Sequence, residues 1–378
     1  MMALVQFVER VVERLRETPV DLRLLAPEGG PASIFMGGAG VAFFLHETAR
    51  LQERDELLPL ARRWCAAARG WADRSTPQAW SDLPVGFVQG TVGLSYVEAL
   101  LSVREGDAAQ AVLAVERIER AATRLSELAR PTELFGGAAG IASATQCLEA
   151  RLPPAAEYDA ARTILKALRE RMIDRVLRRY RAALDPGAND MLGFAHGIAG
   201  ELWALAALLG ADHAIVRPRL SDLTALSERD DEGLVYWLPR WGQSPDVPML
   251  GTLCNGMAGH TLLWCEVARR TRDAAAIELA GLCARSVTVL VTASPTLCCG
   301  LTGQAVALHR YAERSGDRRF TRRADARLGR AIRIVEQAGD ETPFLGVWQG
   351  VLGIALIAMG RLHGEQAIPC VEPLSQLV

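Results

Sequence analysis

Two kinds of apolar pattern alternate along the chain. One is a run with few charges, such as "ELWALAALLG" (201–210) or "QAVALHRYAE" (304–313). The other is a charged stretch with apolar residues at helical period, such as "AVLAVERIERAATRLSELAR" (111–130). A helix with few charges belongs inside a protein, and an amphipathic helix belongs at its surface. No stretch has the pattern of a strand, so we predict an all-α chain in which inner and outer helices alternate.

A glycine repeat precedes each inner run. The pattern G-x-x-G stands before such a run seven times, with successive first glycines 44 to 60 residues apart. The first glycines are Gly37, Gly90, Gly137, Gly197, Gly256, Gly300 and Gly350. Seven helical hairpins of this kind bury a core by stacking on one another. We therefore predict one domain over residues 1–378, a seven-repeat α/α toroid (a double-layered helical barrel), in which glycine lets backbones approach closely where inner helices begin.

Composition narrows the class of protein. The 378 residues are 50% hydrophobic and carry a net charge of −2, without a basic block or an arginine-rich face, so a dedicated nucleic-acid binder is not expected. The N-terminal stretch "MMALVQFVERVVERLRETP" is amphipathic and unlike a signal peptide. The longest uncharged apolar run, 344–359, is short and interrupted by glycines, so no membrane segment is expected. Eight cysteines without a secretory signal favour a reducing, cytoplasmic location.

Aligning the repeats brings candidate ligands together. Parallel inner helices would gather their N-termini at one end, so the residues just before the first glycines would line a common cavity. Position −1, directly before the glycine, holds Met36, Gln89, Gly136, His196, Asn255, Cys299 and Gln349. Position −2 holds Phe35, Val88, Phe135, Ala195, Cys254, Cys298 and Trp348. Neighbouring repeats four, five and six thus supply a histidine and three cysteines at matching positions.

These residue types suggest a metal centre. Three thiolates at helix N-termini suit zinc, and three protein ligands leave one position open for catalysis. Cys254, Cys298 and Cys299 are therefore candidate zinc ligands; buried structural thiols, or a strained Cys298–Cys299 disulfide, are the alternatives. His196 is a candidate general acid or base, with a histidine satisfied by local backbone as its alternative.

The motifs "FAHGIAG", "LCNGMAG" and "LCCGLTG", with the seven glycine repeats, resemble the LanC-like family of lanthipeptide cyclases over essentially the whole chain. The resemblance implies an α/α toroid with a catalytic zinc held by Cys254, Cys298 and Cys299. Many members have histidine at the position of Cys299. A Cys-Cys-Gly variant with an all-cysteine site is also known in the family. It also implies a reaction: a thiol of a dehydrated precursor peptide, deprotonated on zinc, adds to dehydroalanine or dehydrobutyrine and closes a thioether ring. A dehydratase would prepare that peptide.

The resemblance also assigns roles near the metal. His196 matches the family's histidine and would protonate the enolate left by the addition. Glu133, in "PTELFGGAAG", matches an acidic residue that is an aspartate in the family, one methylene shorter. Leu250 and Asn255 stand where the family often has an arginine and an aromatic residue or histidine. Arg240 is within reach in sequence.

Three other functions fit parts of the pattern. The same fold and zinc would suit addition of a small thiol such as glutathione to dehydrated residues of proteins. A non-catalytic peptide-binding scaffold with a structural zinc would explain the missing arginine. A toroidal glycosidase is disfavoured because positions −1 and −2 hold no carboxylate. The chain could also be the cyclase part of a larger dehydratase–cyclase, although a stand-alone polypeptide is favoured.

Overall fold

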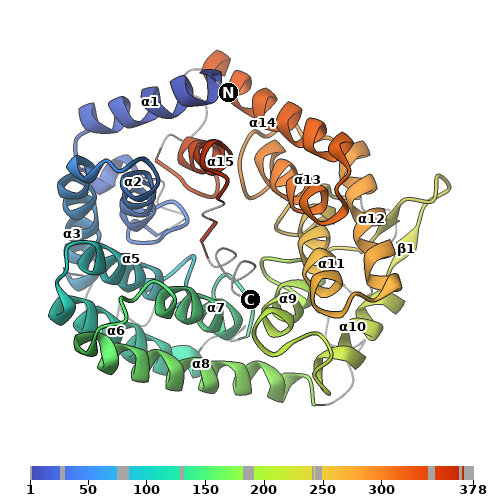
Figure 1. Cartoon of the computed structure of the whole chain (residues 1–378), viewed down its shortest axis with the longest axis horizontal. Coiled ribbons are helices and arrows are strands. Elements are labelled where there is room, and N and C mark those ends of the chain that lie inside the picture. Colours follow the sequence, from blue (N-terminus) through green and yellow to red (C-terminus); the bar gives the residue numbers. More distant parts are fainter. Residues whose placement is uncertain are drawn as a thin grey trace. The chain divides into compact units, whose positions relative to one another are not determined.

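The computed structural model describes residues 2–25, 30–74, 85–127, 132–181, 191–240, 242, 249–338, 345–365 and 368–369. The chain divides into two compact units. Unit 1 comprises Met1–Pro131, Phe135–Met172 and Ala338–Val378, and unit 2 comprises Thr132–Leu134 and Ile173–Gln337. Figure 1 shows the helices of each unit.

Unit 1 contains four inner helices and their outer partners. The inner helices are α2 (Gly38–Gln52), α5 (Thr91–Arg104), α7 (Ala138–Glu149) and α15 (Val351–His363). The outer helices are α1 (Met2–Glu17), α3 (Leu58–Arg74), α6 (Ala108–Ala122) and most of α8 (Asp159–Arg179). Short 3-10 turns lie at Leu22–Leu24, Asp55–Leu57, Thr123–Glu127 and Ala156–Tyr158. The N-terminal helix α1 packs against α15, so the two ends of the chain together complete one inner–outer pair.

Unit 2 contains the remaining repeats. Its inner helices are α9 (Ile198–Leu209), α11 (Met257–Thr271) and α13 (Leu301–Ser315), and its outer helices are α10 (Val216–Ala225), α12 (Ala274–Val289) and α14 (Arg318–Ala338).

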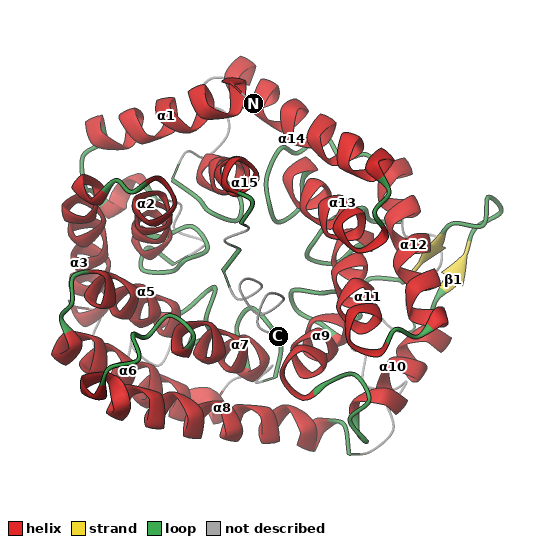
Figure 2. Cartoon of the chain, viewed as in Figure 1, coloured by secondary structure: helices red, strands yellow, loops and turns green. Residues whose placement is uncertain are grey.

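One small β-hairpin corrects the prediction that the chain has no strand. Strand β1 (Glu228–Arg229) pairs antiparallel with β2 (Val235–Tyr236), and Figure 2 shows the pair outside the helices. Asp230 closes the turn, accepting a hydrogen bond from the backbone N–H of Leu234 at 2.8 Å. Strands of two residues are too short to produce an alternating pattern, and the sequence therefore gives no sign of them.

Burial follows the predicted division into inner and outer helices. In α9 every residue from Ile198 to Ala207 is buried. In the outer helix α6 only a stripe at helical spacing is buried: Ala111, Ala114, Val115, Ile118 and Ala122. Among the described residues, no helix is long and apolar enough to cross a membrane.

Helix α14 corrects a second expectation, that the chain has no arginine-rich face. Its exposed arginines are Arg318, Arg319, Arg322, Arg323, Arg330 and Arg333. Burial, followed by the charges of Arg330 and Arg323, lowers the pKa of Arg327. The net charge of the whole chain is near zero and does not indicate that arginines are concentrated in α14. The helical period places these arginines on one face of the helix.

The glycine pairs have the role that the repeat predicts. Each first glycine is the N-cap of an inner helix and has extended backbone angles. The second glycine lies where the preceding loop crosses the helix: a Cβ added at Gly200 would overlap the carbonyl oxygen of Phe194, and one at Gly93 would overlap that of Phe87. Backbone therefore meets backbone at the start of the inner helices, and only glycine fits there.

Replacing Gly200 by alanine is expected to lower the free energy of unfolding by ~2–3 kcal/mol, because Phe194 or the start of α9 must move. Gly329→Ala in α14 is the matched control. An added Cβ there meets only a side-chain atom of Arg333, at 3.5 Å, so removing a helical glycine should stabilise the chain by ~0.5–1 kcal/mol. Urea unfolding of both variants decides the point, and equal midpoints would contradict the steric explanation.

Candidate functional site

Backbone hydrogen bonds link successive repeats at position −2. In five of the described repeats the N–H in this position donates to the carbonyl oxygen of position −2 in the next repeat. In unit 1 the bonds run from Trp348 to Phe35 (3.1 Å), from Phe35 to Val88 (2.9 Å) and from Val88 to Phe135 (2.9 Å). In unit 2 they run from Ala195 to Cys254 (2.8 Å) and from Cys254 to Cys298 (3.2 Å). Within each unit the structure therefore has the register that the glycine alignment predicts.

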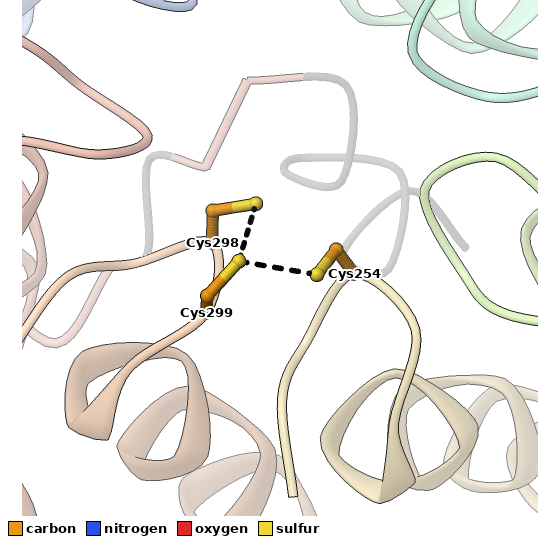
Figure 3. A group of neighbouring side chains, drawn as sticks. All are labelled: Cys254, Cys298 and Cys299. Carbon is orange, nitrogen blue, oxygen red and sulfur yellow. Dashed lines mark hydrogen bonds between the residues drawn. The ribbon is translucent and has the colours of Figure 1, made fainter. Parts of the chain in front are cut away.

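Three sulfur atoms meet in unit 2, as Figure 3 shows. The Cys254 Sγ lies 3.4 Å from that of Cys299, which lies 3.5 Å from the Cys298 Sγ. All three atoms lie within 4.8 Å of one another. Cys254 and Cys298 are buried, whereas Cys299 is partly exposed. They stand in the loops that lead into α11 and α13, and together they could hold a metal ion.

The donor set fits zinc. Four sulfurs at ~2.3 Å around a tetrahedral ion lie ~3.8 Å apart, a separation within the range that these three atoms span. Zinc also favours thiolate ligands. The cysteines are free thiols in this structure, and their sulfur separations exceed the ~2.05 Å of a disulfide.

Hydrogen bonding among the three cysteines sets the ionisation of their thiols. Hydrogen bonds from the Cys298 and Cys299 thiols lower the pKa of Cys254 to about 3. The same interactions raise the pKa of Cys299 to about 12 and also raise that of Cys298. One thiolate therefore forms readily, but three forming together need a compensating cation. Elsewhere burial raises the pKa of Cys265 to about 12, so that thiol stays protonated.

His196 and Glu133 form a histidine–carboxylate pair. The Nδ1 atom of His196 lies 2.5 Å from Oε2 of Glu133. The His196 side chain is 30% exposed and that of Glu133 is 8% exposed. Because a carboxylate oxygen accepts the bond, Nδ1 carries the hydrogen, and Nε2 is the nitrogen that can exchange a proton with another molecule.

The loop of His196 packs directly on the loop of Cys254. Besides the bond from Ala195 to Cys254, a Cβ added at Gly193 would lie 2.5 Å from Asn255 Oδ1 and 2.7 Å from the Cys254 carbonyl oxygen. The Oδ1 atom of Asn255 is buried and has no hydrogen-bond partner among the described residues. The loop of Cys254 therefore contacts both the loop of His196 and the loop of Cys298 and Cys299.

Arg240 is not brought to this cluster. It is exposed, and its backbone pairs with Met191 at the start of the His196 loop. No hydrogen bond or ion pair within the described ranges joins its guanidinium to His196 or to the cysteines. Leu250, where the family often has arginine, is half-buried, and its carbonyl oxygen accepts a hydrogen bond from Met257.

Sequence reasoning missed a buried acid beside the pair. Glu201 lies in the first turn of α9 and is 1% exposed. The signal that could have found it is its charge, since it is the one ionisable residue in the otherwise apolar run "GIAGELWALAALLG" (197–210).

Glycine-capped inner helices, with a sulfur cluster at the start of two of them, define a helical repeat protein with a candidate metal centre. The chain belongs to the lanthionine synthetase C-like family, because the model of that family matches residues 30–372. A solved structure named nisin cyclase matches with a TM-score of 0.68 and 15% sequence identity, covering 96% of this chain and 94% of that chain. Comparison with curated protein sequences gave no match. These findings confirm the predicted fold class, the all-α LanC-like helical toroid.

Proposed function

We propose that this protein is a zinc-dependent lanthionine cyclase. It adds a cysteine thiol of a dehydrated precursor peptide to dehydroalanine or dehydrobutyrine and so closes a thioether ring. One observation carries the proposal: three sulfurs within 4.8 Å lie on two joined loops, and the loop of Cys254 touches the loop of His196, whose ring contacts Glu133. The family and the likeness to nisin cyclase support a cyclase-type function.

Cys254, Cys298 and Cys299 would hold the zinc. When bound, the ion would supply Lewis acidity that favours the thiolate form of the substrate cysteine. The chain itself sets the positions of the three sulfurs, because the backbone bond from Cys254 to Cys298 holds the two loops together.

His196 would complete the reaction. Attack of the thiolate on the β-carbon forms the C–S bond and moves the electron pair of the C=C bond into an enolate. Protonated His196 would give its Nε2 proton to the α-carbon, which leaves the imidazole of His196 neutral. Glu133 would accept the Nδ1–H bond throughout, hold the ring in place and stabilise its charged form.

Residues 1–378 would form a single cyclase domain, and a separate dehydratase would prepare the peptide. Each of the seven described cysteines is a free thiol, which is in keeping with a reducing cytoplasm.

A thiol-alkylation assay tests the reaction. Peptides with one cysteine and one dehydroalanine, joined by spacers of different lengths, are incubated with the zinc-loaded chain. Cyclisation leaves the peptide mass unchanged but removes the thiol that N-ethylmaleimide would alkylate. Loss of alkylation no faster than without protein would contradict the proposal. A mass gain with glutathione, on a peptide that lacks cysteine, would instead support addition of small thiols.

A further inference from the structure

The buried carboxyl group of Glu201 is held by three donors. It accepts hydrogen bonds from the Thr132 hydroxyl at 2.9 Å, from Nη1 of Arg179 at 3.3 Å and from the hydroxyl of Tyr180. Burial raises the pKa of Glu201, and nearby Glu133 adds to the rise, whereas Arg179 opposes it. A buried acid is costly unless it is paired in this way, so its presence inside an inner helix needs an explanation.

The position of Thr132, one of these donors, offers an explanation. Thr132, which donates to Glu201, directly precedes Glu133, which accepts from His196. Glu201, at the start of α9, therefore holds Thr132, and His196, in the loop before α9, holds the adjacent Glu133. Leu134 adds a third contact, since a Cβ on Gly200 would lie 3.1 Å from the Leu134 Cβ.

The grouping of the chain agrees with this contact. Thr132–Leu134 belongs to unit 2, together with α9, although the residues that follow, Phe135–Met172, belong to unit 1. Contacts with unit 2, including those with Glu201 and Gly200 of α9, therefore fix the place of this segment. Arg179 also donates to the Thr132 hydroxyl, at 3.2 Å, so that hydroxyl is fixed from two sides.

We propose that Glu201 and Thr132 are positioning residues that hold Glu133 against His196. The inference rests on the proposed role of His196 as proton donor. A glutamate side chain has three rotatable bonds and loses much conformational freedom when it is fixed. Anchoring the residue before it restricts where its carboxylate can lie, and so favours the 2.5 Å contact with Nδ1 of His196. Neither positioning residue touches the reacting atoms.

The test compares two substitutions at one position. Thr132→Val has almost the same shape but lacks the hydroxyl, whereas Thr132→Ser keeps it. We expect Thr132→Val to lower kcat by about 10- to 100-fold with KM and zinc content unchanged, and Thr132→Ser to restore most of the rate. If Thr132→Val does not fold, Tyr180→Phe removes another donor to Glu201 and should shift kcat in the same direction.

A double-mutant cycle separates positioning from general stability. If Thr132 acts through Glu133, adding Thr132→Val to Glu133→Gln should cause no further loss of rate. Full additivity of the two losses would overturn the proposal.

A measurement without substrate distinguishes failure of this inference from failure of the proposed function. Imidazole ¹⁵N spectra, with His196→Asn used for assignment, should show His196 protonated at Nδ1 when neutral in wild type and a mixture of tautomers in Thr132→Val. An unchanged His196 signal in Thr132→Val would overturn the positioning role. If wild type closes no ring yet the signal shifts as expected, the cyclase assignment is wrong while the positioning holds.

Discussion

Replacing Cys298 and Cys299 together by alanine is expected to reduce zinc from about one ion per chain to almost none. The double variant keeps only Cys254 of the three sulfur donors. The fold should persist, because the loops are joined by backbone hydrogen bonds such as that from Cys254 to Cys298. Elemental analysis of protein purified without added metal, with circular dichroism and thermal unfolding alongside, measures both quantities.

Cys265→Ala/Cys283→Ala is the matched control. It removes two buried thiols from the same unit but leaves the sulfur cluster intact, so its zinc content should equal that of wild type. Zinc retained by the Cys298/Cys299 variant would remove these residues from the site. If folded wild type takes up no zinc under reducing conditions, the zinc mechanism is wrong. Unfolding of the Cys298/Cys299 variant would favour a structural ion in a non-catalytic scaffold.

His196→Asn should lower kcat for ring closure by about 10²- to 10⁴-fold, the range typical of general acid–base catalysis. Asparagine can still donate a hydrogen bond to Glu133, but it cannot deliver a proton. Zinc content should not change, because the substitution leaves the sulfur ligands in place. The alkylation assay and elemental analysis on the same preparation provide both measurements.

His213→Asn controls for loss of a histidine elsewhere in unit 2. His213 lies in the loop before α10, where its Nδ1 accepts a hydrogen bond from the backbone N–H of Ile215 at 3.3 Å. Its replacement should leave kcat near the wild-type value. Comparable rates for the two variants would mean that His196 is not the proton donor.

The repeat architecture could be predicted from sequence because its signals are local. Each G-x-x-G marks a helix start, and the first glycine is the N-cap in every repeat, as at Gly197 and Gly256. The register of position −2 followed from the same glycines, and it brought Cys254 next to the Cys298–Cys299 pair without any structure.

Contacts that depend on packing could not be predicted in this way. The bond between Thr132 and Glu201 joins residues 69 apart, and no local pattern marks it. Glu133 was named through the family resemblance, and only the structure shows its hydrogen bond to His196. The docking of α1 on α15 likewise joins the two ends of the chain. The roles of the five site residues remain predictions.

The backbone hydrogen bonds that join position −2 of successive repeats have one further consequence. Because only main-chain atoms take part, the connection does not depend on the identity of the side chain, and in this chain it carries phenylalanine, valine, alanine, cysteine and tryptophan alike. Natural variation can therefore exchange one ligand or wall residue for another without rebuilding the framework. Cys254 and Cys298 stand at this position, so two of the three candidate ligands could be exchanged while the connection between their loops is kept.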